Sequence, residues 1–348
     1  MIKMRLTIIL TIVLYMGACQ LFLGPDPDNS PRGIFEHVWT DFNETYALFE
    51  HKGIDWNAVY KQFTPRISSN MDDRELFNVL AEMLKVLDDA HVILSSSFAF
   101  SNSAGWLESA NIDPFSLDVI KTYLTNGGTT TADGMFTYGT FSSNPEIGYI
   151  YIAGFVHNEG IAATAHQNWI RAIDGIVQSL SNTNSLILDN RSNWGGLPAN
   201  VNFIASRFAS THKNYADIRT KNGPGRNDFS APVYEEIRPD GTRYTKPIVL
   251  LTNSQTISGA EWFTLALRSQ DHITHIGETT VGALSLSLDR PLINGWRYTV
   301  SVQIVRDMNG ICYEGTGIAP EHIVVNTPDE IAAGKDSQLE FALGFLTK

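Results

Sequence analysis

The chain has 348 residues, enough for one large domain or two modest ones with a substantial core. Hydrophobic residues make up 43% and charged residues 18%, which is the composition of a globular protein. The formal net charge of -12, without any stripe of Lys and Arg, excludes a general nucleic-acid binder, because phosphate contacts need clustered cations.

The N-terminus is predicted to lie outside the folded domain. Basic residues precede an apolar run from Leu6 to Tyr15, and small residues then lead to Cys19, which is the pattern of a secretory signal. The run is short for a membrane span. It resembles the lipobox of bacterial lipoproteins, so residues 1–18 would be a signal peptide and a lipidated Cys19 would begin a tether, residues 19–32. A signal peptide without a lipid and an uncleaved anchor are the alternatives.

Residues 33–95 are predicted to form a helical cap. Hydrophobic residues recur there at spacings of three and four, which is the period of a helix face packed on a core. Asp72 or Asp73 supplies a helix start signal. The recurring residues are Phe35, Val38, Trp39, Phe42, Tyr46, Phe49, Leu76, Leu80, Met83, Leu84 and Leu87.

His91 follows the last predicted helix of the cap, in the sequence Asp88-Asp-Ala-His91. A histidine at the end of a helix can reach a cleft, and a neutral imidazole is the usual base that activates a serine. A surface or capping role is the alternative, and it is the commoner fate of a single histidine. No set of side chains has metal-ligand spacing, so we expect no metal and no other cofactor.

Residues 96–146 form a loop-rich insert, for which the sequence predicts a short helix near residues 116–124 and a weak strand around residues 135–138. From residue 147 to residue 348 strands and helices alternate, which indicates an α/β layer. The predicted strands are 147–153, 185–189, 248–252, 273–276 and 296–305, and the predicted helices are 161–180, 199–209 and 259–268. Cys312 is expected to be a small buried hydrophobe.

A glycine-rich turn follows the strand that ends near Asp189. It closes with Gly195-Gly196 and precedes a helix. Such a turn can bring backbone N–H groups to face a ligand and could donate hydrogen bonds to an oxyanion. An ordinary turn, with Asp189 and Arg191 paired internally, is the alternative.

Two further polar residues stand at element boundaries in this half. Ser258 lies where a buried strand passes into a helix, and a helix start favours an alkoxide or an oxyanion. The sequence Ser258-Gly-Ala-Glu261 is also a capping box, which is the alternative. Glu314 lies in a Gly-rich turn, where a carboxylate can orient a histidine as in a serine triad. A solvent-exposed turn residue is the alternative for Glu314.

With these residues in view, the chain resembles the C-terminal processing (tail-specific) serine peptidases, and within them the branch of tricorn-core and retinoid-binding-protein-like sequences. Four blocks match in order, and they are the cap ending in Leu87-Asp-Asp-Ala-His91, Asp189–Gly196, Thr252–Gly282 and Gly315–Leu343. The resemblance implies a crotonase/ClpP-like α/β core with an N-terminal helical cap. The interval of about 50 residues before Ile147 is too short for the PDZ module that many members carry.

The resemblance also implies roles for single residues. Ser258 would be the nucleophile, His91 its base and Glu314 the carboxylate that completes the charge relay. The N–H of Gly259, with that of Gly195 or Gly196, would form the oxyanion hole.

Two departures from the family pattern bear on these roles. Ala283 stands where the processing peptidases carry a lysine base, so a serine–lysine pair is not available. Ala90 stands where the tricorn-like branch has a serine before the histidine.

We therefore expect a serine peptidase that cleaves peptide or protein substrates without a cofactor and does not bind nucleic acid. A lipid on Cys19 would hold it in the bacterial cell envelope, on the periplasmic face or the surface of the outer membrane. Gln20 is not an aspartate, which by analogy disfavours retention in the inner membrane. A catalytically inactive peptide- or ligand-binding relative and an esterase-type acyl hydrolase that uses the same residues are the alternatives.

Overall fold

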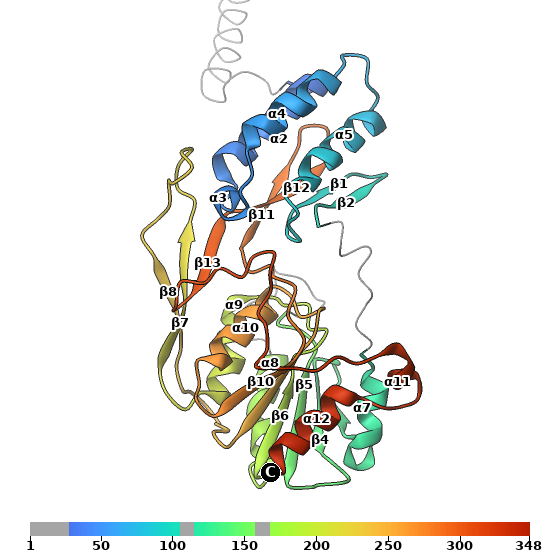
Figure 1. Cartoon of the computed structure of the whole chain (residues 1–348), viewed down its shortest axis with the longest axis vertical. Helices are drawn as coiled ribbons and strands as arrows, with labels where there is room; N and C mark the ends of the chain where they lie inside the picture. The colour runs from blue at the N-terminus through green and yellow to red at the C-terminus, as the bar shows by residue number, and fades with distance from the viewer. Residues whose placement is uncertain (1–27, 105–114, 157–167) are drawn as a thin grey trace, which may run out of the picture.

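The computed structural model describes residues 28–104, 115–156 and 168–348 of the chain. In Figure 1 the cap lies at the top and the α/β core, with the C-terminus, at the bottom. The predicted signal peptide, Cys19 and most of the tether lie outside the described residues. No helix within the described ranges is long and apolar enough to cross a membrane.

The core is built on a seven-stranded sheet in the order β14-β10-β9-β6-β5-β4-β3. The first five of these strands run parallel, and β4 and β3 continue the sheet antiparallel. The bounds are β3 (Thr129–Thr130), β4 (Phe136–Thr140), β5 (Ile147–Ile152), β6 (Ser185–Asp189), β9 (Ile248–Thr252), β10 (Ile273–Gly277) and β14 (His322–Ile323).

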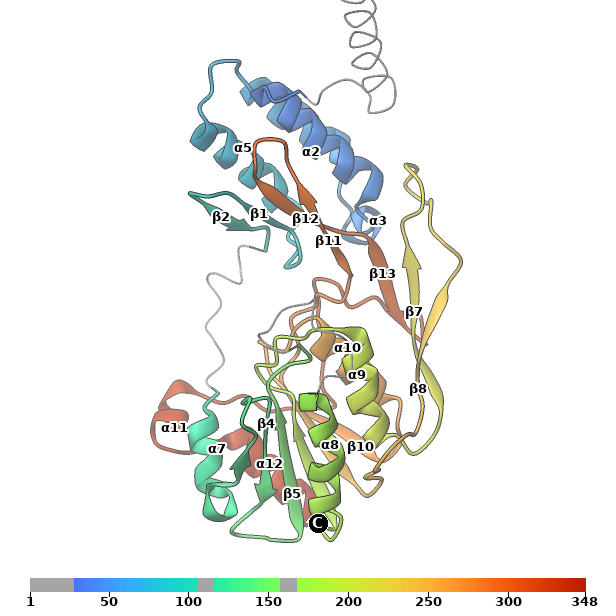
Figure 2. The ribbon, with the colours of Figure 1, turned by 180° about the vertical axis from the view of Figure 1, so that it is seen from behind.

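Helices cover both faces of this sheet, which explains why its central strands are apolar throughout. Alternate residues of one strand point to opposite faces. Leu186 and Leu188 of β6 pack with α8 (Asn168–Ser179), α9 (Pro198–Ala205) and α10 (Gly259–Arg268), whereas Ile187 packs with α7 (Leu117–Tyr123) and α12 (Ser337–Leu346). Figures 1 and 2 show these two helical layers from opposite sides.

The cap combines helices with a four-stranded sheet in the order β11-β12-β1-β2. Its helices are α2 (Pro31–Thr45), α3 (Phe49–Lys52), α4 (Trp56–Phe63), η1 (Thr64–Arg66) and α5 (Asp73–Lys85), and its strands are β1 (Ile93–Ser95), β2 (Phe100–Asn102), β11 (Ser287–Pro291) and β12 (Arg297–Ser301). The predicted aromatic faces meet in one hydrophobic cluster, to which Trp296, Tyr298 and Val300 of the distant hairpin also belong. The predicted fold class is confirmed, but the cap is only partly helical, since a segment from the core half completes it.

The single strand predicted over residues 296–305 is two strands that lie in different sheets. β12 ends at Ser301, and β13 (Gln303–Asp307) joins β7 (Lys213–Thr220) and β8 (Val233–Ile237) in a three-stranded sheet. The alternating pattern continues across Val302, so the sequence carries no mark of the change of partner. This three-stranded sheet runs along one side of the molecule from the core toward the cap (Figures 1 and 2).

Most of the described part of the predicted insert contributes to the core, whereas its strand β2 belongs to the sheet of the cap. The helix and the strand expected there are α7 and β4, and η2 (Thr125–Gly127) and β3 lie between them. β4 pairs antiparallel with β5 over five residue pairs, from Phe136↔Ile152 to Thr140↔Gly148. Two other short elements, η3 (Ser206–Phe208) and α11 (Pro328–Ala332), connect larger ones.

Candidate active site

Ser258 is held in a strained turn between β9 and α10. Its φ of 60° and ψ of -123° are values that a residue other than glycine adopts only at a cost of about 1–3 kcal/mol. The buried carboxylate of Glu261 fixes this turn, because it accepts hydrogen bonds from the Ser258 N–H at 3.0 Å and from the N–H of Ala283 at 2.8 Å. Glu261 thus makes the helix-capping contact that the sequence suggested, and the turn around Ser258 is fixed at the same time.

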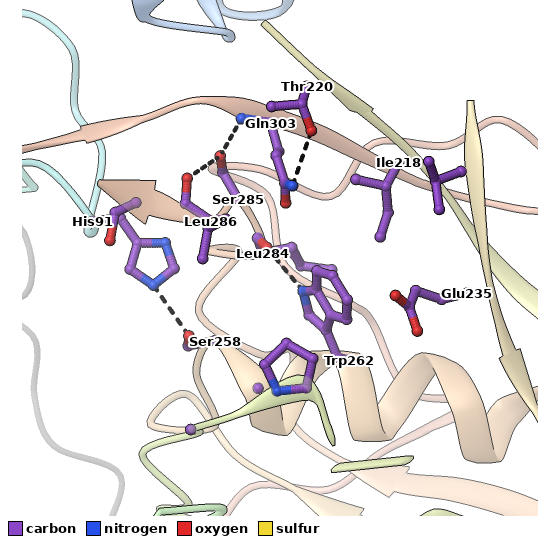
Figure 3. A pocket seen from close by; sticks show the side chains of 15 residues that line it. His91, Ile218, Thr220, Glu235, Ser258, Trp262, Leu284, Ser285, Leu286 and Gln303 are labelled. Atoms are coloured by element: carbon purple, nitrogen blue, oxygen red, sulfur yellow. Dashed lines mark hydrogen bonds between the residues drawn. The ribbon is translucent and has the colours of Figure 1, made fainter. Parts of the chain in front are cut away.

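His91 reaches Ser258 from the cap. Its Nε2 lies 3.2 Å from the Ser258 Oγ, although 167 positions separate the two residues (Figure 3). The backbone around His91 is fixed, since its N–H donates to the Asp89 Oδ1 at 2.8 Å and its carbonyl accepts from the Thr299 Oγ1 at 2.5 Å. The structure therefore brings the predicted nucleophile and base within hydrogen-bond reach.

Burial keeps the imidazole of His91 uncharged near neutral pH. It lowers the pKa of His91 below the ordinary value of 6.5, while the negative charge of Asp89 acts in the opposite direction. The Nδ1 of His91 is buried and has no hydrogen-bond partner in the described part of the chain. A neutral imidazole is the form that can accept a proton from a serine.

Glu314 is close to this site but makes no hydrogen bond to His91 among the described residues. Its Oε1 accepts from the N–H of Leu284 at 2.8 Å and from the N–H of Ser285, and its side chain is buried. Burial and the charge of Asp89 raise the pKa of Glu314 well above its ordinary value. The predicted role of Glu314 in orienting the imidazole stays a prediction.

Asp89 is the carboxylate that the sequence analysis did not assign. It is 2% exposed, bonds the backbone N–H of His91, and accepts a hydrogen bond from the Tyr46 hydroxyl at 3.0 Å. Two adjacent aspartates precede the histidine, and sequence alone does not show which of them turns inward. The buried partner Tyr46 lies 43 positions away, in the loop after α2.

The glycine pair of the Asp189–Gly196 turn packs directly on the Ser258 turn. A Cβ atom on Gly259 would lie 2.7 Å from the Gly196 nitrogen, and one on Gly195 would lie 2.6 Å from the Gly259 nitrogen. The predicted oxyanion donors therefore differ in whether their N–H is available. The Gly195 N–H is already bonded to the Asn193 Oδ1 at 2.9 Å, so Gly195 is needed for the close approach and does not offer a donor. The N–H groups of Gly196 and Gly259 have no acceptor among the described residues.

The same turn also contains the ion pair between Asp189 and Arg191, which the sequence analysis gave as the alternative to a role in oxyanion binding. The Arg191 guanidinium is fully buried, with its Nη2 2.6 Å from the Asp189 Oδ2 and its Nη1 2.8 Å from the Asp336 Oδ2. Asp336 is in turn the N-cap of α12. The two interpretations are therefore compatible, because this ion pair anchors the turn that presents Gly195 and Gly196.

A cavity of about 310 Å³ opens beside the Ser258 hydroxyl. Figure 3 shows it extending from Ser258 away from His91, toward side chains of the three-stranded sheet. The sequence analysis missed these walls, because β7, β8 and β13 contain no local motif.

Cys312 does not line the cavity, and burial raises the pKa of its thiol. The described ranges contain no group of three side chains that could hold a metal ion.

Comparisons with known proteins match two parts of the chain to family models. A model described as "Peptidase family S41" matches residues 146–324, and one described as "Tricorn protease C1 domain" matches residues 27–85. The carboxy-terminal processing proteases CtpB and CtpA of Bacillus subtilis (strain 168) are 24% identical over 190 residues and 28% identical over 183 residues. These matches cover 54% and 53% of the chain but only 36% of the length of each relative.

A solved structure of a putative peptidase from Parabacteroides merdae ATCC 43184 covers more of the chain. It superposes with a TM-score of 0.81 at 31% identity, over 92% of this chain and 98% of that one. The similarity therefore extends over cap and core together.

Proposed function

The chain belongs to peptidase family S41, and from this premise we propose that it is a serine peptidase of the C-terminal processing type in which Ser258 attacks the peptide carbonyl. The observation that carries the proposal is the distance of 3.2 Å between the Ser258 Oγ and the His91 Nε2, beside two backbone N–H groups that have no acceptor in the described part of the chain. A nucleophile, a base and oxyanion donors are the three parts that acyl transfer requires.

The proposed reaction follows from these positions. Neutral His91 takes the proton of the Ser258 hydroxyl as the oxygen attacks the carbonyl carbon. The oxyanion that forms accepts hydrogen bonds from the N–H groups of Gly259 and Gly196, each of which is worth on the order of 10²–10³ in rate. His91 then gives its proton to the leaving amine, and water releases the acyl group by the same steps in reverse.

The carboxyl groups of Asp89 and Glu314 would stabilise the charged form of His91. Both are buried, and burial together with the negative charge of Asp89 raises the pKa of Glu314 well above its ordinary value. A negative charge next to the newly formed imidazolium of His91 favours the transition state. We retain Glu314 as the third member of the charge relay and add Asp89 as a positioning residue.

We further propose that the protein is secreted and tethered to the bacterial cell envelope through a lipid on Cys19. The support is the signal-like sequence before Cys19 and the position of the first described helix, α2, in the cap. A tether that enters at the cap would leave the core free. Incorporation of radiolabelled palmitate in the wild type, and its loss in Cys19→Ala, tests this attachment.

Labelling with a serine-directed fluorophosphonate tests the proposed chemistry directly. We expect wild-type protein to be labelled, Ser258→Ala not to be labelled, and His91→Ala to be labelled at least about 10²-fold more slowly, because the base is missing. Equal labelling of all three, or of none, would instead support a binding protein without catalysis. A panel of matched peptide and ester substrates then separates the peptidase from the esterase alternative.

A further inference from the structure

The cavity beside Ser258 has apolar walls on its sides. They are formed by Ile218, Val233, Trp262, Leu284 and Leu286. The one polar atom of the Trp262 side chain is already used, since its Nε1–H donates to the Leu284 carbonyl at 2.8 Å. Such walls suit the methylene stem of a long side chain.

A carboxylate faces this cavity from β8. Glu235 lines it and points into it across from Trp262 (Figure 3). Its Oε2 accepts a hydrogen bond from the Asn202 Nδ2 at 2.9 Å, and the Asn202 Oδ1 accepts from the Tyr215 hydroxyl at 2.8 Å, so the carboxylate is held in place. Glu235 takes part in no ion pair within the described residues, and none of the fifteen residues around the cavity is a lysine or an arginine.

A buried hydrogen-bond acceptor that has no donor among the described residues lines the same cavity. The Gln303 Nε2 donates to the Thr220 Oγ1 at 3.0 Å, and the Gln303 Oε1 is buried with no hydrogen-bond partner in the described chain. A buried acceptor without a partner costs free energy that a donor from a ligand would recover. The ligand that satisfies both Glu235 and Gln303 therefore carries several N–H donors and a positive charge.

The direction of the cavity identifies which part of a substrate would enter it. His91 must face the leaving amine in order to protonate it, and the cavity extends from Ser258 on the other side (Figure 3). The side chain that enters the cavity thus belongs to the residue whose carbonyl is attacked. We propose that Glu235 and Gln303 select substrates with lysine or arginine at this position, immediately before the cleaved bond.

This proposal rests on the proposed peptidase chemistry, and the test separates the two. Peptidyl diphenyl phosphonates that differ only in the last residue (Lys, Arg, Leu or Glu) modify an active serine at rates that report side-chain preference without turnover. We expect wild-type protein to react roughly 10- to 100-fold faster with the Lys and Arg probes than with the Leu probe, because a charge-assisted hydrogen bond replaces a neutral contact. The Glu probe should react slowest.

The variant Glu235→Gln should lose this preference by a similar factor, measured as the ratio of the rates with the Lys and Leu probes. Glu236→Gln is the matched control, since Glu236 pairs with His212 and Arg238 and does not line the cavity. If fluorophosphonate labels Ser258 but the basic preference is absent, or survives in Glu235→Gln, the proposal is overturned. If fluorophosphonate does not label Ser258, the proposed function itself is wrong.

Discussion

At the scale of single residues, the proton affinity of His91 is set by two opposing influences. Burial lowers its pKa, and the nearby charge of Asp89 partly restores it. Because the reaction needs the neutral imidazole, kcat/KM falls as pH drops through the pKa of His91 in the free enzyme. The acid limb of the wild-type profile should therefore lie below pH 6.5.

Replacing Asp89 should move this limb in a defined direction. Asp89→Asn removes the influence that raises the pKa of His91, so the limb should shift to lower pH. The plateau of kcat/KM should fall by about tenfold or more, because the charged imidazole loses the nearby negative charge. Asp88→Asn is the control, because Asp88 has a φ of 46°, which asparagine tolerates well. A limb that moves to higher pH in Asp89→Asn would contradict this account.

At the scale of elements, one buried arginine joins the oxyanion turn to the last helix. Arg191 bonds Asp189 at the end of β6 and Asp336 at the start of α12, and all three side chains are fully buried. An arginine left without one of its carboxylates in such a place is costly, since the desolvation of its charge is no longer compensated. The helix α12 therefore contributes to the position of Gly196 without touching it.

Removal of Asp336 should show this cost. Asp336→Ala should lower the free energy of unfolding by about 3–5 kcal/mol, measured by urea denaturation. Asp55→Ala is the matched control. Asp55 also caps a helix, since it accepts from the Ala58 N–H at 3.1 Å, but it forms no hydrogen bond with an arginine among the described residues. Asp55→Ala should cost only about 1 kcal/mol. Equal losses in the two variants would mean that the buried ion pair adds nothing beyond helix capping.

At the scale of the whole molecule, stability should decline on acidification partly because of a buried histidine in the core sheet. His275 lies in β10 with its Nε2 2.7 Å from the Thr252 Oγ1, and burial, helped by the charge of Arg268, lowers its pKa to about 3. Between pH 6.5 and this value the unfolded chain binds a proton that the folded one does not, so stability falls as pH falls, by up to about 1.4 kcal/mol per pH unit.

His275→Asn should reduce this slope. Urea midpoints at pH 7, 5.5 and 4.5 measure it, and the wild type should lose stability more steeply than the variant by close to one proton. His212→Asn serves for comparison, because His212 is half-exposed and pairs with Glu236 at the surface. Parallel pH profiles for wild type and His275→Asn would show that the buried imidazole does not contribute.

The core and much of the candidate site could be predicted from the sequence, because their signals are local. The apolar strands, the glycine pair at residues 195–196 and the serine at a helix start each appear within a few residues. The strands of the cap could not, since Leu94 pairs with Tyr298 across about 200 positions and no local pattern specifies that partner. Glu235 and Gln303 were missed for the same reason, because they meet only through the three-stranded sheet.

The hairpin β11–β12 has a consequence for when the molecule could first become active. The segment that carries His91 is hydrogen-bonded to this hairpin. The Thr299 hydroxyl accepts from the Ile93 N–H and donates to the His91 carbonyl. Ribosomes add Thr299 to the chain after both His91 and Ser258. A nascent polypeptide that ends before residue 299 therefore lacks the contacts that fix the backbone around His91, and proteolysis would begin only after the hairpin has been added.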